Sequence, residues 1–384
     1  MYDPDLKATP LYPFHRDAGA RIVPFAGYAM PVQYKDGVLA EHRWTRQHAG
    51  LFDVSHMGPA RLVLNNPTGN PEADHRAVAA IMERLVCGDI AGLKPGQLRY
   101  TLLLNEDGGV VDDLIVGRYP AGAPGGMLYV VVNASTKDND YALIQAAAGD
   151  EATVHRMDGA GLLAVQGPEA AEVVAGLIPA AADLGFMTFA GGEWRGHMIM
   201  VSRSGYTGED GYEILVPPEA AEAFWTALTT DPRVKPIGLG ARDSLRLEAG
   251  LPLYGHDLDE TTSPVEGALR FAVSKRRRDA RDFPGADRIL REWDGDLARV
   301  RVGLKIAGAP AREGAEIATP AGQVVGRVTS GGPSPSLGIN IAMGYVPPPL
   351  AAPGTALSVL VRGRPQAAEV TAMPFHPNRY VRKV

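Results

Sequence analysis

The sequence after Trp293 alternates between apolar and polar residues, and this pattern limits the possible folds more than any other feature. Every second side chain is apolar in residues 300–306, and residues 357–361 repeat the alternation. A period of two is that of a β-strand with one buried face. Gly-Gly-Pro at 331–333 and Pro-Pro-Pro at 347–349 mark turns between such strands. The sequence therefore predicts a separate all-β module over roughly the last 90 residues.

The region before Trp293 mixes helical and strand patterns. Helical spacing of apolar residues occurs in four segments, 39–49, 168–178, 217–228 and 241–249. Strand patterns at 99–104 and 110–119 flank Asn105-Glu-Asp-Gly-Gly, whose Asp-Gly step is typical of a hairpin, and a third strand follows at 127–133. A chain of 384 residues is too long for one ordinary core. We therefore expect an α+β region and two or three domains in all.

Composition and charge exclude several classes of protein. The 45 glycines and 31 prolines are about one residue in five, but 45% hydrophobic and 21% charged residues are typical of a folded chain. The excess therefore predicts many turns. A formal charge of −6 gives no overall attraction to nucleic acid or anionic lipid. The single cysteine, Cys87, cannot form an internal disulfide or a cysteine cage, and no metal site is predicted.

Two features bear on where the protein is found. The N-terminal residues lack the basic and then apolar order of a signal peptide. No apolar run approaches the roughly 20 residues that a membrane-spanning helix needs. From these patterns we expect a soluble, cytoplasmic protein.

An acidic pair, Asp112 and Asp113, stands inside the apolar strand pattern of residues 109–117. Alternation places the two side chains on opposite faces, and both faces are otherwise apolar. At least one carboxylate should leave bulk water, which costs several kcal/mol unless it is compensated. The pair is either part of a chemical site or a strand-edge feature satisfied by backbone donors, with about even weight from the residues alone.

Three other polar features have both a functional and a structural interpretation. Glu213 lies on a strand after a glycine-rich turn at 204–211, where it could face inward as an acceptor. Arg242 stands at a helix start, from which it could bind a carboxylate with two hydrogen bonds or lie on the surface. The basic run Lys275–Arg278 is either a solvated loop or a docking patch for an acidic protein or an anionic ligand tail.

Taken together, the motifs resemble one family: the T proteins, or aminomethyltransferases, of the glycine cleavage system. The resemblance runs in order along essentially the whole chain. The matching strings are Thr9-Pro-Leu, Val23-Pro-Phe-Ala-Gly-Tyr-Ala-Met-Pro-Val-Gln-Tyr, Gly50-Leu-Phe-Asp-Val-Ser-His-Met, Asn105-Glu-Asp-Gly-Gly-Val-Val-Asp-Asp-Leu-Ile-Val, Gly205-Tyr-Thr-Gly-Glu-Asp-Gly-Tyr-Glu-Ile, Ala241-Arg-Asp-Ser-Leu-Arg-Leu-Glu-Ala-Gly-Leu, Thr329-Ser-Gly-Gly-Pro-Ser-Pro-Ser-Leu, Ala342-Met-Gly-Tyr-Val-Pro and Met373-Pro-Phe.

The resemblance implies a fold and an activity. The fold would be a three-domain cloverleaf around a central folate pocket, with two α+β domains and a C-terminal β-barrel. The expected domains are 1–55 plus 150–235, 56–149 plus 236–290, and 291–384. The enzyme would take the aminomethyl group from the lipoyl arm of its partner, the H protein, and pass the methylene to tetrahydrofolate. Ammonia, 5,10-methylenetetrahydrofolate and dihydrolipoyl H protein would be the products.

The resemblance also implies roles for individual residues. Asp113 would be the catalytic aspartate, Glu213 would bind the pterin edge, and no metal would be needed. The lipoylated H protein would dock at Lys275–Arg278. The residues expected to contact folate or line its pocket are Glu213, Arg242, Tyr380, Asn133, Tyr206, Tyr100 and Met57.

Two other functions fit the same motifs. A folate-dependent demethylase would keep the fold and the pterin pocket but use another donor. A non-catalytic folate-binding protein in iron–sulfur assembly would carry a cysteine in a glycine-rich motif, whereas Cys87 is far from the turn at 205–211. The string Gly-Gly-Val-Val-Asp-Asp favours the aminomethyltransferase.

Overall fold

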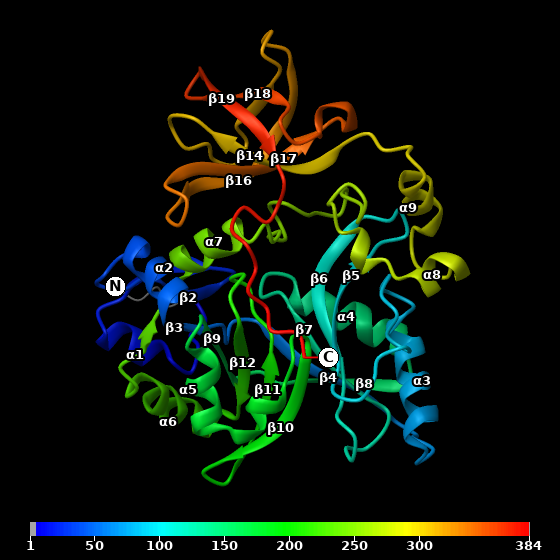
Figure 1. Ribbon diagram of the computed structural model, residues 1–384. Helices are drawn as coiled ribbons and strands as arrows, with labels where there is room; N and C mark the ends of the chain where they lie inside the picture. The colour runs from blue at the N-terminus through cyan, green and yellow to red at the C-terminus, as the bar shows by residue number, and fades with distance from the viewer. Residues whose placement is uncertain (1–4, 384) are drawn as a thin grey trace.

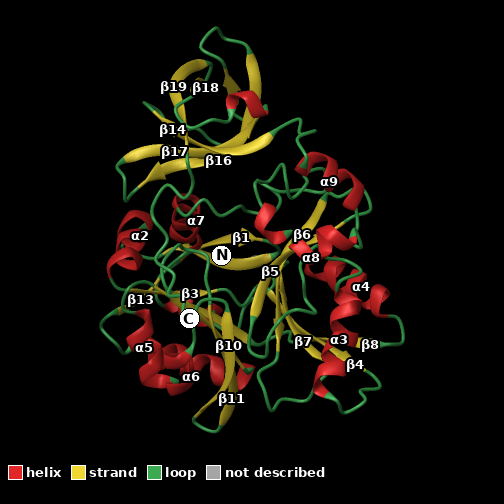
Figure 2. Cartoon of the chain, turned by 45° about the vertical axis from the view of Figure 1, so that its right-hand side comes forward, coloured by secondary structure: helices red, strands yellow, loops and turns green. Residues whose placement is uncertain are grey.

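The computed structural model describes residues 5–383, in which three β-structures each form the centre of one body (Figure 1). A six-stranded sheet and a five-stranded sheet stand side by side, and a closed barrel lies above both. Figure 2 shows most helices on the outer flanks of the two sheet-containing bodies, with the strands between them. The expected mixture of α+β structure and a C-terminal barrel is confirmed.

The first body is built on the six-stranded sheet, whose order is β10-β11-β12-β9-β3-β13. Helices α5 and α6 pack against it and bury a core that includes Phe224 and Trp225. Only β13 runs parallel to its neighbour, β3. The bounds are α1 Tyr12–Asp17, α2 Val38–Gln47, β3 Ala49–Asp53, β9 Gly161–Gln166, α5 Ala170–Leu177, η1 Pro179–Asp183, β10 Thr188–Trp194, β11 His197–Arg203, β12 Gly211–Val216, α6 Pro218–Thr229 and β13 Val234–Pro236.

The second body is built on the antiparallel sheet β5-β6-β7-β4-β8. Helices α3 and α4 cover it. The bounds are β4 Gly58–Leu64, α3 Pro71–Met82, β5 Leu98–Leu104, β6 Val110–Arg118, β7 Met127–Val132, α4 Lys137–Ala148 and β8 Ala152–Arg156. Strand β8 pairs with β4, although the expected boundary at residue 150 assigns it to the first domain. The division of the chain into domains otherwise stays a prediction.

The third body is the antiparallel barrel β14-β17-β16-β15-β18-β19. Its interior is filled by the apolar set of the alternating pattern, including Val302, Leu304 and Val359. Closure leaves no open sheet edge. The bounds are β14 Val300–Ile306, β15 Glu316–Ala318, β16 Val324–Ser334, β17 Ile339–Val346, η3 Pro348–Leu350, β18 Ala356–Val361 and β19 Arg364–Thr371.

The remaining elements join the three bodies. Helix α7 (Leu239–Glu248) packs on α2, on the ribbon of β1 (Arg21–Phe25) and β2 (Tyr28–Gln33), and on barrel strands β16 and β17. After β19 the chain leaves the barrel and returns to the first body, as the red trace in Figure 1 shows. There Arg379 N donates to Gly208 O at 2.8 Å and Phe186 N donates to Val381 O at 2.8 Å. The barrel is therefore held to the first body in two ways, by the packing of α7 on β16 and β17 and by the returning C-terminal segment.

The basic run is helical, which corrects the expectation of a loop. It forms α8 (Lys275–Ala280), which follows η2 (Arg270–Ala272) and precedes α9 (Ala286–Trp293). The guanidinium of Arg277 is buried and pairs with Glu83 at 2.6 Å and Asp282 at 3.0 Å. Arg277 therefore holds α8 against the second body and is unavailable to a partner.

The four expected helices are present as α2, α5, α6 and α7, and the hairpin at 105–109 joins β5 to β6. Among the described residues, no helix is both long and apolar enough to span a membrane.

Candidate active site

Strand β6 delivers both aspartates, and close packing at its start keeps water from one of them. A Cβ on Gly109 would lie 1.7 Å from the carbonyl oxygen of Glu260, so only glycine fits there. Val110 N donates to Thr262 O at 3.0 Å in the same contact. The loop at 259–262 thus covers the start of the strand, just before the acidic pair.

Asn133, directly after β7, binds both carboxylates. Its backbone N–H and its Nδ2 donate to the two oxygens of Asp112, at 3.0 and 2.8 Å. The same Nδ2 donates to Asp113 Oδ1 at 2.9 Å. Asp112 is 0% exposed, whereas Asp113 is partly exposed. The asparagine therefore fixes an inner and an outer carboxyl group relative to each other.

Burial of these carboxyl groups moves their acid–base equilibria toward neutral pH. Burial, reinforced by the charge of Asp112, raises the pKa of Asp113 to about 7, although bonds from Tyr100 and Asn133 oppose the shift. Burial and the charge of Asp140 raise the pKa of Asp112 to about 8. A carboxyl group with a pKa near the working pH can both hold and release a proton, which general acid–base catalysis requires.

Glu213 is held on β12 by a short chain of hydroxyl groups. Ser204 Oγ donates to Glu213 Oε2 at 2.9 Å, and Ser202 Oγ lies 2.8 Å from Ser204 Oγ. The carboxylate is partly exposed, so part of its accepting capacity faces outward. An anchored carboxylate with free acceptor sites can bind neighbouring N–H donors on a flat ring.

The turn that carries Ser204 and Tyr206 is fixed by Gln166. The amide Nε2 of Gln166 donates to Ser204 O at 2.9 Å, and Thr207 Oγ1 donates to Gln166 Oε1 at 2.8 Å. A Cβ on Gly205 would lie 1.9 Å from Gln166 Oε1. The glycine at this position lets the turn close on the buried amide.

Arg242, in the first turn of α7, has unused donor capacity. Its guanidinium carbon lies 4.9 Å from the centre of the Tyr206 ring, and its Nη1 is buried without a hydrogen-bond partner among residues 5–383. Burial lowers the pKa of Arg242, and the nearby charge of Glu213 opposes that shift. A buried guanidinium with a free donor fits an anionic or carbonyl group of a ligand.

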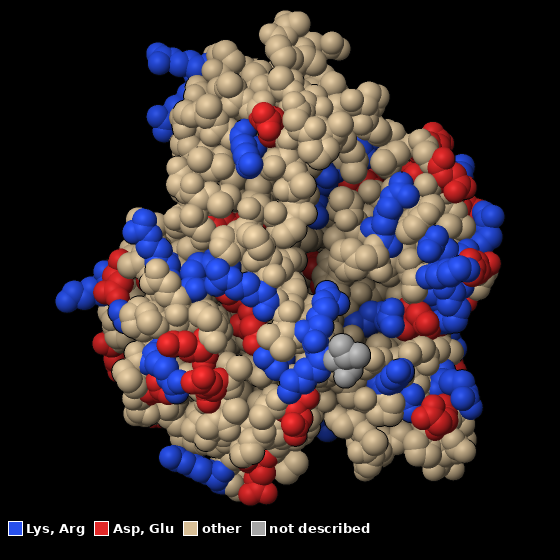
Figure 3. All heavy atoms as spheres, in the orientation of Figure 1, with Lys and Arg blue, Asp and Glu red and all other residues tan. Residues whose placement is uncertain are grey.

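Electrostatic and ring contacts bring most of the predicted residues into one group. Asp113 and Tyr206 both act on Tyr100, whose own pKa is raised, first by burial. Arg242 in turn lies over Tyr206 and senses Glu213. The group therefore extends from the second body to the first, where Figure 3 shows a hollow between the bodies and the barrel.

Two predicted residues have contacts outside this group. Tyr380 stacks on Phe186 with ring centres 4.1 Å apart and an interplanar angle of 11°. Met57 packs against the core that includes Leu98 and Tyr129. The roles expected for Tyr380 and Met57 stay predictions.

Sequence reasoning missed Asp140 and the anchoring role of Ser204. Asp140 lies in the first turn of α4 and is 0% exposed, with its charge facing Asp112. The signal available was the polar run between Asn133 and Asp140 directly after an apolar strand. The signal for Ser204 was its position directly before Gly205, at the start of the glycine-rich turn.

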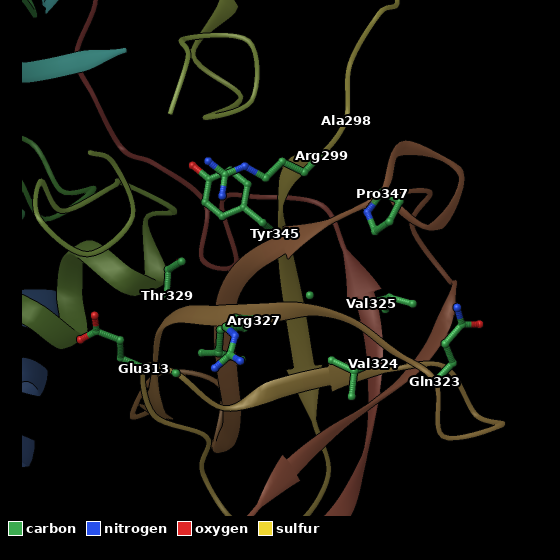
Figure 4. A pocket seen from close by; sticks show the side chains of 13 residues that line it. Ala298, Arg299, Glu313, Gln323, Val324, Val325, Arg327, Thr329, Tyr345 and Pro347 are labelled. Atoms are coloured by element: carbon green, nitrogen blue, oxygen red, sulfur yellow. The ribbon is translucent and has the colours of Figure 1, made fainter. Parts of the chain in front are cut away.

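Another depression lies away from these residues, on the barrel (Figure 4). It has a volume of about 760 Å³ and contains Arg299, whose guanidinium lies 4.7 Å from the centre of the Tyr345 ring and pairs with Glu266 at 3.0 Å. None of the predicted site residues lines it. Among residues 5–383, no three His, Cys, Asp or Glu side chains are grouped so as to hold a metal ion.

Comparison with known proteins gives a consistent result over the whole chain. Residues 11–277 match the model of the GCVT N-terminal domain family, and residues 299–376 match that of the glycine cleavage T-protein C-terminal barrel domain. The chain is 47% identical to a Homo sapiens protein named aminomethyltransferase, mitochondrial, over 98% of this chain and 91% of that protein. It is 44% identical to a probable mitochondrial aminomethyltransferase of Schizosaccharomyces pombe, over 98% and 94% respectively.

A solved structure gives the same result in three dimensions. The crystal structure of a glycine cleavage system aminomethyltransferase T from Bartonella henselae superposes with a TM-score of 0.88 and is 41% identical in sequence. The superposition covers 98% of this chain and 100% of the other.

Proposed function

Since the chain belongs to the glycine cleavage T-protein family and is a folate-dependent aminomethyltransferase, we propose that Asp113 holds and moves the proton in its reaction. In this reaction the aminomethyl group comes from the lipoyl arm of the H protein, and its methylene passes to tetrahydrofolate as ammonia leaves. One observation supports this role above the others. The Asp113 carboxyl is held by Asn133, faces Tyr100, and has a pKa raised to about 7 by burial and by Asp112.

The residues around Asp113 fit a folate. Glu213, anchored by Ser204, would accept the N–H donors along the edge of the pterin. Arg242, with its unpaired buried Nη1, would bind an anionic or carbonyl group farther along the same molecule. When bound, tetrahydrofolate supplies the nitrogen that receives the one-carbon unit. We assign Tyr100, Tyr206, Asn133, Met57 and Tyr380 to the lining of this pocket.

Asp113 would act in two ways. Its partly exposed carboxyl orients the reacting amine, because Asn133 restricts its rotation. Its raised pKa lets it give or take one proton near neutral pH, which the departure of ammonia requires. A negative charge at this point would also stabilise positive charge that develops on the donor carbon.

Release of ammonia tests the reaction in which this role is proposed. Aminomethylated H protein is incubated with the enzyme, with and without tetrahydrofolate, and ammonia and methylenetetrahydrofolate are measured. We expect release to depend on the enzyme and to rise strongly with the folate. Turnover of N-methyl donors in the absence of H protein would instead support the demethylase.

For the partner, we propose that the H protein docks over α8 and the neighbouring η2. Lys275 has a side chain that is 79% exposed, and the half-exposed Arg276 lies beside it. Phe271 is 72% exposed, and its ring centre lies 5.8 Å from that of Tyr100, which faces Asp113. A basic helix beside an apolar ring at the site suits an acidic protein that must deliver an aliphatic arm.

The docking proposal is tested by neutralising exposed charge and leaving Arg277 intact. We expect Lys275→Gln with Arg276→Gln to raise the KM for the H protein severalfold at low salt, with little change in kcat. The effect should shrink at high salt, because salt screens exposed charges. Arg43→Gln, on the exposed face of α2, is the control. An unchanged KM at low salt would show that α8 is only a solvated surface.

A cytoplasmic location also stays a prediction. The names of the human relative and of the Schizosaccharomyces pombe relative both contain the word mitochondrial. Fractionation of the source cells with an antibody to the protein would test it.

A further inference from the structure

Asp140 is a buried acid that receives no hydrogen bond. Both of its carboxyl oxygens lack a partner among residues 5–383, and the residue is 0% exposed. The hydroxyl in its turn, Thr136 Oγ1, donates to Asn133 O at 3.3 Å, and its proximity to Asp140 lowers the pKa of that acid by less than burial raises it. An ionised carboxylate without donors or water would be costly to bury. Something other than the surrounding amides and hydroxyls must therefore compensate it.

The group that faces Asp140 is a second buried acid, Asp112. Both oxygens of Asp112 accept bonds from Asn133, and the two carboxyl groups interact directly. Two ionised groups in this position would repel each other in a region of low dielectric constant. A single proton between them removes the repulsion and supplies the hydrogen bond that Asp140 lacks.

We propose that Asp112 and Asp140 share one proton, and that Asp140 is a positioning residue that acts on Asp113 through this neutralised neighbour. The shared proton reduces the charge that Asp112 places beside Asp113, which leaves burial as the main cause of the raised pKa of Asp113, and Asp112 still accepts the bonds from Asn133. The Nδ2 group of Asn133 also donates to the main-chain oxygen and to Oδ1 of Asp113, at 3.0 and 2.9 Å. The inference rests on the proposed role of Asp113, but the shared proton itself does not.

The surroundings of the pair are acidic and neutral. Its own strand contributes Asp113, and α4 contributes Thr136 and Tyr141. The segment after α7 contributes Tyr254, whose pKa is raised by burial and then by the charge of Asp112. Burial raises the pKa of Asp140 to about 6, below that of Asp112 at about 8, so the proton belongs mainly to Asp112 at neutral pH.

Infrared spectroscopy can detect this proton without any assay of activity. The parent protein for the measurement is Asp113→Asn, which removes the third titrating acid of the group. We expect the carbonyl band of a protonated carboxylic acid at pH 7, and its loss when Asp112→Asn is added. Adding Asp140→Asn instead should lower the titration midpoint of the band by about 1 pH unit or more, because a like charge is removed.

A pair of substitutions at position 112 then tests the effect on catalysis. An amide in Asp112→Asn can accept from Asn133 and donate to Asp140, as the protonated acid does, whereas Asp112→Ala can do neither. We expect kcat of the Asn variant to exceed that of the Ala variant by about tenfold or more, with similar KM values. Thermal unfolding of both variants shows whether they fold.

The outcomes are distinct. Absence of the band at pH 7, or a midpoint that does not move with Asp140→Asn, overturns the shared proton, whatever the activity. A normal band with equal kcat for the Asn and Ala variants overturns the positioning role alone. An inactive native enzyme with a normal band overturns the proposed function and leaves the shared proton standing.

Discussion

Two of the groups of buried carboxylates in the protein differ in their supply of hydrogen-bond donors. At the barrel interface, Glu248 accepts from Arg46 at 2.8 Å, from the Ser334 hydroxyl at 2.6 Å, and from the backbone and hydroxyl of Ser336 at 2.9 and 2.7 Å. At the candidate site, the donors to Asp112 within residues 5–383 come from Asn133, and the two oxygens of Asp140 have no partner in that range. Both groups lie in dry protein, so burial alone does not set their chemistry.

The difference appears in their acid–base properties. Burial would raise the pKa of Glu248, but bonds from His42, Ser334 and Ser336 hold it well below its usual range. The pKa values of Asp112 and Asp113 are raised instead. A carboxylate with many donors stays charged and fixes structure, whereas one with few donors stays near its titration point and can exchange protons.

The largest expected effect is at the donor-poor group. Asp113→Asn should lower kcat by ~10²- to 10⁴-fold, because the amide keeps the shape but cannot exchange the proton. Folate affinity and thermal stability should change little. Steady-state ammonia release, with calorimetric folate binding as the companion measurement, checks this. A variant that keeps near-native kcat would show that Asp113 does not exchange a proton in the reaction, and the functional difference between the two groups would not hold.

At the donor-rich group the expected loss is in stability. Glu248→Ala should lower the free energy of unfolding by about 3–5 kcal/mol, since it leaves Arg46 and several donors buried without their acceptor. Urea unfolding measures the change. Glu222→Ala, on the exposed face of α6, is the matched control and should change stability by less than about 0.5 kcal/mol. Equal effects at the two positions would contradict the structural role of Glu248.

A smaller effect is expected in the dependence of stability on pH. A carboxyl group whose pKa is higher in the folded than in the unfolded state binds protons more readily when folded. Lowering the pH from 8 to 6 should therefore add stability on the order of 3 kcal/mol through Asp112 and Asp113, whose folded-state pKa values are about 8 and about 7. Asp112→Asn should flatten this part of the profile.

The opposite sign applies to Glu248. Its lowered pKa contributes stability above the unfolded value of about 4, and this contribution is lost as the pH falls further. Unfolding measured at several pH values separates the range between pH 6 and 8, where Asp112 and Asp113 act, from the acidic range, where Glu248 acts. If Asp112→Asn altered the stability profile below pH 4 and not between pH 6 and 8, the assignment of the change between pH 6 and 8 to Asp112 would be wrong.

The smallest effects come from removing one hydroxyl at each group. Ser336→Ala should cost about 1–2 kcal/mol of stability and leave the KM for folate unchanged. Ser204→Ala should raise that KM severalfold with little loss of stability, because Glu213 is partly exposed and less well anchored without it. Kinetics and unfolding are measured for both variants. A raised KM for folate in Ser336→Ala, or a large loss of stability in Ser204→Ala, would contradict these separate roles.

Local patterns in the sequence predicted much of the fold. The barrel follows from the alternation after Trp293, and the β5–β6 hairpin from its Asp-Gly step. Helix α3 had a comparable local signal, since Asn70 Oδ1 accepts from Glu72 N and Ala73 N, and Pro71 stands at the first turn. That cap was overlooked.

The hydrogen-bond donors that surround each carboxylate could not be predicted from the local sequence. Asp112 and Asp140 meet because α4 begins shortly after β7, the neighbour of β6 in the sheet, and Glu248 collects its donors from α2 and the barrel. Arg277 illustrates the same limit, since its partner Glu83 is 194 residues away along the chain. Alternation placed Asp112 and Asp113 on opposite faces, but only the packed structure shows which of them is dry.

The return of the chain from the barrel to the first body has a consequence for biosynthesis. Residues 376–383 contact α7, the turn at 205–211 and the segment before β10, all of which leave the ribosome earlier. The surface for this segment must stay open while the barrel is being made. The final packing of the first body therefore follows translation of the barrel, so that the native contacts of the N-terminal half are completed only after the C-terminal half has been synthesised.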